Sequence, residues 1–79
     1  MLPEQSRAAR GLLDWSQTQL ARAANLGEST VRDFEKGRRL PSTNNLAAIR
    51  AALEAAGVDF IAENGGGAGV RLRKASGTD

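Results

Sequence analysis

The side chains that most often carry out catalysis are missing from this chain. None of its 79 residues is a histidine, a cysteine or a tyrosine. The chain therefore lacks an imidazole as a general base, a thiolate as a metal ligand and a phenol as an acid. Serines and carboxylates remain, but they cannot form a hydrolytic triad without an imidazole. We expect no catalytic activity, no metal site and no cofactor.

The most concentrated polar chemistry lies on one predicted helix, residues 28–36. At about 100° per residue, Val31 and Phe34 point to one side of this helix, toward a core. The opposite face carries only polar and charged side chains: Glu28, Ser29, Arg32, Asp33 and Lys36. Hydrogen-bonding groups displayed in this way are typical of a recognition helix, which presents them to base edges in the major groove of DNA.

Two further groups of residues are suited to binding phosphate. Ser16 and Gln19 have the spacing of a capping box, which starts a helix and places Gln17 in its first turn. The N-terminus of a helix attracts anions. Three cations follow one another closely after residue 35: Lys36, Arg38 and Arg39. They form either a solvated surface or a set of phosphate contacts beside the recognition helix, and the sequence leaves both interpretations open.

Four helices are expected to position these groups. Alanine, leucine and arginine recur at helical spacing up to residue 56, and caps or helix breakers interrupt them. We predict helices over residues 3–13, 16–24, 28–36 and 42–56. The second and third are joined by a three-residue turn, 25–27, as in a helix-turn-helix unit. The positions expected to face the core are Ala9, Leu12, Leu13, Leu20, Ala21, Ala24, Leu46, Ile49, Ala52 and Leu53. Trp15 either stacks on a base or packs on this core.

The pattern changes from helical spacing to alternation after Gly57. Val58, Phe60, Val70 and Leu72 alternate with polar residues over 58–62 and 70–73, although Ile61 breaks the alternation. The glycine-rich segment between the two stretches contains an Asn-Gly turn signal. We therefore predict a mainly α fold, with a four-helix domain over 1–57, a short C-terminal β-hairpin over 58–74 and a disordered tail over 75–79. The glycines do not form a P-loop, because no Gly-Lys-Ser/Thr ending or helix follows them.

The predicted hairpin raises two questions that the sequence leaves open. Arg71, Arg73 and Lys74 form either a second clamp on a nucleic-acid backbone or the wet face of a plain strand, and their alternation with Val70 and Leu72 favours the plain strand. A lone two-stranded hairpin is marginally stable in water. It must pack either on the hairpin of a second chain, which we expect, or on the fourth helix of its own chain.

The overall charge is compatible with a nucleic-acid partner without requiring one. The formal net charge is +2, and the sequence pI is about 9.9. No stretch resembles a signal peptide or a membrane span, so we expect a cytoplasmic location.

A joint motif links these features to a known family. Ser-Gln-x-x-Leu-Ala, from residue 16, is followed by Val-Arg-x-Phe-Glu-x-Gly, from residue 31. With these motifs, residues 5–57 resemble the lambda-repressor-like, or Xre-type, helix-turn-helix domains of bacterial transcriptional regulators. The glycine-rich tail is similar to one that a group of short bacterial regulators add to this domain. Other residues that carry the resemblance are Arg10, Trp15, Asn25, Leu26, Gly27, Thr30, Lys36, Pro41, Ser42, Leu46 and Ile49.

The resemblance implies roles for individual residues. Gln17, with Ser16 beside it, matches a position that binds a backbone phosphate, and Arg10 and Glu35 match an ion pair between the first and third helices. The resemblance also implies that Trp15 packs on the core rather than stacking on a base. The positions at or beside those that read bases are Glu28, Ser29, Arg32 and Asp33. The family often has Gln, Asn or Arg where this chain has its two carboxylates, which accept from cytosine N4 and are repelled by phosphate.

The leading hypothesis is sequence-specific binding of double-stranded DNA by a homodimer, acting as a bacterial transcriptional regulator. One such module has a small footprint, so two copies on half-sites about 34 Å apart are expected. The alternative is an antitoxin-like or adaptor module that binds another protein, supported by the acidic residues of the recognition face and the apolar alternation of the tail. Salt dependence separates the two, because phosphate contacts weaken steeply as salt rises.

Overall fold

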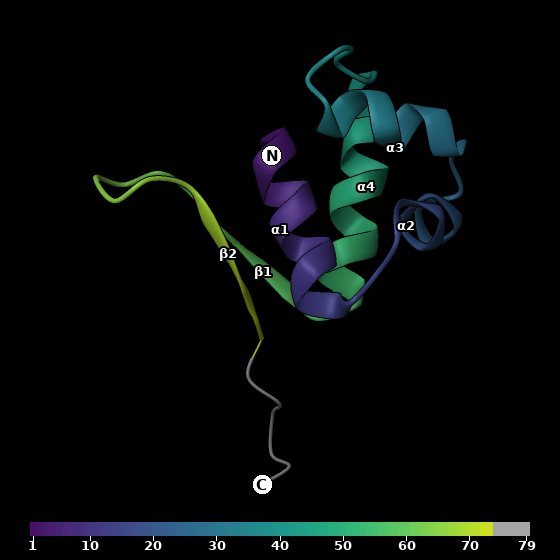
Figure 1. The fold of residues 1–79 in the computed structure, drawn as a ribbon. Coiled ribbons are helices and arrows are strands. Elements are labelled where there is room, and N and C mark those ends of the chain that lie inside the picture. Colours follow the sequence, from purple (N-terminus) through teal and green to yellow (C-terminus); the bar gives the residue numbers. More distant parts are fainter. Residues whose placement is uncertain (74–79) are drawn as a thin grey trace, which may run out of the picture.

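The computed structural model describes residues 1–73, which form four α-helices followed by a two-stranded antiparallel hairpin (Figure 1). The helices are α1 (Pro3–Leu13), α2 (Gln17–Ala24), α3 (Glu28–Glu35) and α4 (Thr43–Ala55), and the strands are β1 (Val58–Ile61) and β2 (Gly69–Leu72). The predicted fold class is confirmed. The predicted tail over 75–79, together with Lys74, lies outside the described residues.

The ends of α1 and α2 follow from local chemistry. Pro3 occupies the first turn of α1, where its missing N–H would have had no partner in the helix. The predicted capping box of α2 is present: Ser16 Oγ accepts from the Gln19 N–H at 3.1 Å, and Gln19 Oε1 accepts from the Ser16 N–H at 2.7 Å. Asn25 then ends α2 in the left-handed conformation, with φ 58°, which its short polar side chain tolerates.

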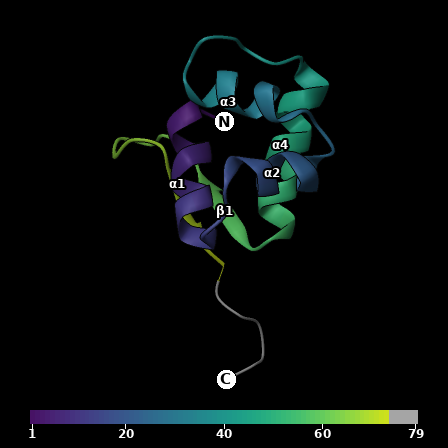
Figure 2. The ribbon, with the colours of Figure 1, turned by 45° about the vertical axis from the view of Figure 1, so that its right-hand side comes forward.

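The third helix ends one residue earlier than predicted. Lys36 is its C-cap rather than its last turn, and Gly37 follows with φ 72°. Glycine adopts this conformation without steric cost, so the chain can leave the helix abruptly. The segment between α3 and α4 then arches over one end of the molecule (Figure 2), and Ser42 caps α4 by accepting from the Asn45 N–H at 3.1 Å.

The core lies where all four helices and β1 meet. Its fully or nearly fully buried apolar residues are Ala9, Leu20, Ala21, Ala24, Val31, Phe34, Ile49, Leu53 and Val58. Leu13, Trp15, Leu46 and Ala52 are partly buried against this core, so the expected packing of Trp15 is confirmed. The prediction was wrong for Leu12, which is 42% exposed. Gln5, Ser6, Ala9 and Leu13 define the inward stripe of α1, and Leu12 falls at its border.

The hairpin packs on α1 and α4 of its own chain, which is the packing that the sequence analysis gave as the alternative to packing on a second chain. Val58 is opposite Leu72 and Phe60 is opposite Val70, so these four apolar residues share one face, and Val58 is fully buried. The Gln5 amide donates to the carbonyl oxygens of Gly69 at 3.0 Å and Ile61 at 3.4 Å, which ties α1 to both strands. The observed strands are 58–61 and 69–72, within one residue of their predicted bounds.

A cation–π contact adds to the packing of the hairpin on the fourth helix. The Arg50 guanidinium lies 4.9 Å from the centre of the Phe60 ring. Arg50 also pairs with Glu54 at 3.1 Å on the surface of α4.

Within residues 1–73, no helix combines the length and the apolar character that crossing a lipid bilayer requires.

Candidate nucleic-acid interface

The second and third helices form a helix-turn-helix unit with an open outer face. Val31 and Phe34 anchor α3 in the core, so its other side is turned outward. Glu28, Ser29 and Arg32 are exposed there, and Asp33 is half-buried at the edge of the same face. These four sequence-predicted residues therefore lie together on the outward side of α3. That surface offers carboxylate, hydroxyl and guanidinium groups, which hydrogen-bond to base edges.

The segment after α3 folds back on that helix. The carbonyl oxygen of Asp33 accepts from the N–H groups of Arg38 at 2.9 Å and Arg39 at 3.4 Å. Asp33 is half-buried beside this segment. A hollow of about 230 Å³ lies between α3 and the N-terminus of α4, and its polar lining includes Ser29, Asp33, Arg39, Ser42 and Asn45. The N-terminus of α4, which borders this hollow, favours an anion. The sequence analysis did not identify this hollow.

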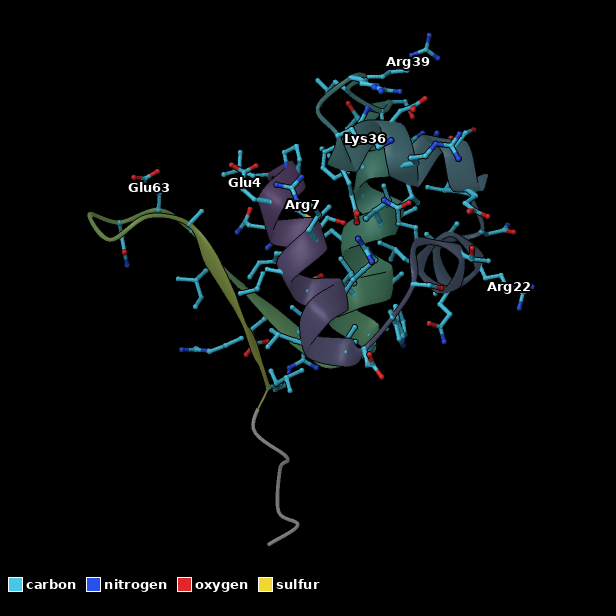
Figure 3. The ribbon with its side chains drawn as sticks, viewed as in Figure 1. Glu4, Arg7, Arg22, Lys36, Arg39 and Glu63 are labelled. Carbon is cyan, nitrogen blue, oxygen red and sulfur yellow. The ribbon has the colours of Figure 1, made fainter. Side chains whose placement is uncertain are left out.

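The three predicted cations border the recognition face. Lys36, Arg38 and Arg39 are all exposed, and Figure 3 shows Arg39 projecting from the end of the molecule that carries α3. Among the ion pairs of residues 1–73, none uses these three side chains. Their charge is therefore available to a phosphate, although an ordinary solvated surface has the same appearance.

The two described cations of the hairpin lie near the same carboxylate. Arg73 lies 3.0 Å and Arg71 lies 3.9 Å from the carboxylate of Asp59. Arg73 also donates to the carbonyl oxygen of Glu54 at 3.1 Å, near the end of α4. This arrangement matches the wet face of a strand, the interpretation that the sequence favoured. Lys74, the third cation of that group, lies outside the described residues.

A buried carboxylate joins three helices behind the recognition face. The Glu35 residue is only 1% exposed. Arg10 approaches it from α1, with Nη2 at 2.7 Å from Oε1 and Nε at 2.9 Å from Oε2. Ser6 Oγ donates to Oε2 at 2.6 Å, and Gln17 Nε2 donates to Oε1 at 3.1 Å. Arg10 and Glu35 thus form an ion pair, and Ser6 and Gln17 complete the hydrogen bonding of the carboxylate.

These contacts control the ionisation of Glu35. Burial by itself raises the pKa of a carboxyl group, because it disfavours the charged form. The hydrogen bonds from Arg10, Ser6 and Gln17, together with the charge of Arg10, outweigh that effect and hold the pKa of Glu35 below its ordinary value. The network is therefore built around an ionised carboxylate.

The predicted phosphate ligand Gln17 belongs to this network. Gln17 is half-buried at the start of α2, whereas Ser16 beside it is exposed. The side-chain amide has two N–H donors, and the bond to Glu35 uses one of them. The second donor leaves Gln17 able to bind an acceptor outside the protein, with Glu35 holding the amide in place.

Two residues of this region were missed by the sequence analysis. Ser6 lies one helical turn before Arg10 on α1, so a small polar side chain at that spacing was the available signal. Arg7 donates to the carbonyl oxygen of Glu35 at the end of α3, and Figure 3 shows it on α1 below Lys36. No local sequence pattern predicts the contact between Arg7 and Glu35, because the two residues belong to separate helices.

This geometry agrees with the comparison to known families. A family model described as helix-turn-helix matches residues 7–59, which span most of α1, all of α2 to α4 and the start of β1. The chain belongs to this family, the Xre or lambda-repressor-like helix-turn-helix proteins. A search of curated proteins found no match.

The family assignment defines the general role of the molecule. Helix-turn-helix proteins of this family bind DNA and are generally not enzymes. The chain is therefore a DNA-binding helix-turn-helix regulator in this general sense. Most of the hairpin lies beyond the matched residues.

Proposed function

We propose that this protein is a bacterial transcriptional regulator that binds double-stranded DNA in a sequence-specific way, with α3 in the major groove. The observation that carries the proposal is the outward polar face of α3, held between the capped start of α2 and the basic segment after α3. A helix displayed in this manner can reach base edges while its neighbours bind the two flanking backbones.

The proposed base contacts come from four side chains of this face. Arg32 is suited to guanine, whose O6 and N7 accept from a guanidinium. Glu28 and Asp33 are suited to cytosine, whose N4 amino group donates to a carboxylate, and Ser29 fits several bases. We infer that carboxylate contacts make the preferred site rich in G·C pairs at these positions.

The proposed phosphate contacts lie on either side of the recognition helix. Ser16 and Gln17 at the start of α2 hold one strand. Lys36, Arg38 and Arg39 hold the other, with the N-terminus of α4 behind them. These contacts fix the position of α3 on the duplex but carry no sequence information.

We further propose that two copies bind two half-sites about 34 Å apart, because one module has too small a footprint for tight binding. In this proposal residues 1–57 contact DNA, and the hairpin within 58–74 joins the two copies.

Selection of bound sites from randomised duplexes tests the proposal. Arg32→Ala is expected to change which bases are preferred. Gln17→Ala is expected to reduce the affinity for all duplexes by a similar factor. Arg22→Ala is the matched control, because Arg22 is exposed on α2 and points away from α3 in Figure 3. Selection of no preferred sequence by the wild type would show that the binding is not specific.

A second candidate function is binding to a partner protein as an antitoxin-like or adaptor module. The observation that favours it is the pair of carboxylates on the recognition face, since Glu28 is exposed and Asp33 is half-buried. The apolar side of the hairpin, where Leu72 is 50% exposed, also favours it. DNA binding is expected to weaken steeply between 50 and 200 mM salt, by about 10³-fold for six or more phosphate contacts. Binding of a partner protein to that apolar surface is expected to change little over the same range.

A further inference from the structure

The outer edge of β2 presents unpaired backbone groups. The Arg73 N–H donates to the carbonyl oxygen of Gly57 at 2.6 Å, so these two residues form a hydrogen-bonded pair. Such pairs alternate with non-bonded pairs along an antiparallel ladder, and the next pair is Val58 with Leu72. The N–H and C=O groups of Leu72, and by the same alternation those of Val70, therefore point away from β1.

Apolar side chains gather beside this edge. A groove of about 330 Å³ runs between α1 and β2, and Leu2, Ala8 and Val70 are among its lining residues. Leu2 is 47% exposed, and Leu72, on the same strand face as Val70, is 50% exposed. Leu12 lies one turn after Ala8 on the same face of α1 and is 42% exposed. Three of the four exposed large hydrophobic residues within 1–73 thus lie along this side.

We propose that β2 of a second copy of this chain pairs with this edge, antiparallel and about a two-fold axis at Val70. The product is a four-stranded sheet with an α1 helix from each copy beside it. This inference refines the dimer of the proposed function by naming its surface. An edge strand is its own complement under a two-fold axis, because each copy supplies the donors and acceptors that the other needs.

Charge selects the register with Val70 opposite Val70. The outward backbone groups also permit Leu72 opposite Val70 or Leu72 opposite Leu72. The register with Leu72 opposite Val70 places Arg71 against Arg71 of the second copy. The register with Leu72 opposite Leu72 places Arg71 against Arg73 of the second copy. Like charges directly opposite each other destabilise a sheet. The proposed register instead places Arg71 opposite Gly69 of the second copy.

The same register sets the cations of each β2 opposite glycines of the second copy. The C-terminal end of β2 is basic, with Arg71 and Arg73. The loop between the strands carries one acidic residue, Glu63, which lies near the tip of the hairpin (Figure 3). Antiparallel pairing centred on Val70 places Arg73 opposite Gly67 of the second copy, in the loop that also carries Glu63. The hairpin and α3 lie on opposite sides of α1 (Figure 1), so the recognition faces stay open.

Cysteine cross-linking of the full chain tests the register, because the natural chain has no cysteine. Val70→Cys is expected to form a disulfide-linked dimer on mild oxidation, since opposed residues of a bonded pair lie about 5.5 Å apart between Cα atoms. Arg71→Cys is the matched control. Its Cα atoms would be diagonal neighbours at about 7–8 Å, too far for a disulfide. Efficient cross-linking of Arg71→Cys without Val70→Cys, or of neither, would overturn the proposal.

A proline at the edge tests the pairing without cysteines. The Leu72 N–H points away from β1, so Leu72→Pro is expected to leave the hairpin of each chain intact. It removes two hydrogen bonds between the copies and raises the dimer dissociation constant about tenfold or more in sedimentation equilibrium. Leu72→Val retains the N–H and is the control. An unchanged dissociation constant in Leu72→Pro would contradict the edge pairing.

DNA binding is measured in parallel to separate this inference from the proposed function. If Leu72→Pro still binds a half-site duplex but loses its advantage on a full site, both proposals are supported. If the wild type binds a specific duplex and Val70→Cys does not cross-link, the function stands and the sheet pairing is wrong. If Val70→Cys cross-links and no specific duplex is found, the pairing stands and the DNA function is wrong.

Discussion

Glu35 connects the stability of this protein to the side that we propose to bind DNA. Its carboxylate accepts hydrogen bonds from Ser6 and Arg10 on α1 and from Gln17 on α2, while its own backbone belongs to α3. Breaking a buried ion pair on one side leaves an uncompensated charge, which is costly. The same carboxylate orients the amide that we propose to bind phosphate, so packing and recognition depend on one ionised group.

The pH dependence of stability follows from this residue. Because the pKa of Glu35 is lowered in the folded state, the unfolded chain binds a proton at higher pH than the folded one. The stabilisation is complete above the ordinary pKa of 4.5 and is lost as the pH falls through the lower, folded pKa. We expect the unfolding free energy of the wild type to drop below pH 4.5 more steeply than that of Glu35→Gln.

Urea denaturation at a series of pH values measures this difference. Glu35→Gln keeps the size of the side chain but cannot titrate, so the other carboxyl groups contribute equally to both proteins. Parallel profiles for the two proteins would show that Glu35 is not the group responsible.

At the scale of elements, the turn between α2 and α3 sets the angle of the recognition helix. Asn25 adopts φ 58° at the end of α2, and Gly27 is the N-cap of α3. The N–H of Leu26 returns to the carbonyl oxygen of Ala21 at 2.9 Å, which closes the end of α2. The conformational preference of one residue therefore governs how α3 is presented.

A matched pair of substitutions at Asn25 tests this role. Asn25→Ala is expected to reduce the unfolding free energy by about 1 kcal/mol, because a side chain without local hydrogen bonding pays the full cost of the left-handed conformation. Asn25→Gly removes that steric cost and is expected to retain stability. Thermal or urea unfolding compares the two, and equal losses in both variants would mean that the backbone conformation is not the cause.

For the whole molecule, the hairpin and the helices share one core. Val58 is fully buried, and Phe60 and Val70 pack against the same cluster. Gln5 and Arg73 add hydrogen bonds that join the hairpin to α1 and to the end of α4. The segment that we propose to pair two copies is therefore held rigidly relative to α1.

Val58→Ala measures how much the hairpin contributes to the fold. Removing two buried methyl groups is expected to lower the unfolding free energy by about 2 kcal/mol, through lost burial and the cavity left behind. Leu40→Ala is the control, because Leu40 is 78% exposed and its truncation is expected to cost less than about 0.5 kcal/mol. Equally small losses of unfolding free energy in Val58→Ala and Leu40→Ala, measured by urea denaturation, would indicate that the hairpin does not share the core.

The sequence by itself determined the local features of this protein. The helices, the capping box at Ser16, the turn at Asn25 and the outward face of α3 all depend on hydrogen bonds or side-chain spacing within a few residues. Each of these features can therefore be predicted from a short stretch of consecutive residues. The joint motif from residue 16 to residue 37 was specific enough to identify the helix-turn-helix family.

Only the tertiary structure decided which distant groups meet. Ser6 and Glu35 are 29 residues apart, and Gln5 and Gly69 are 64 residues apart, yet each pair forms a hydrogen bond. Local spacing also placed Leu12 inward, whereas packing of α1 left it at the border of the core. The physical reason is that the rotation of a helix and the partners of its polar groups are set by the surfaces that close around it.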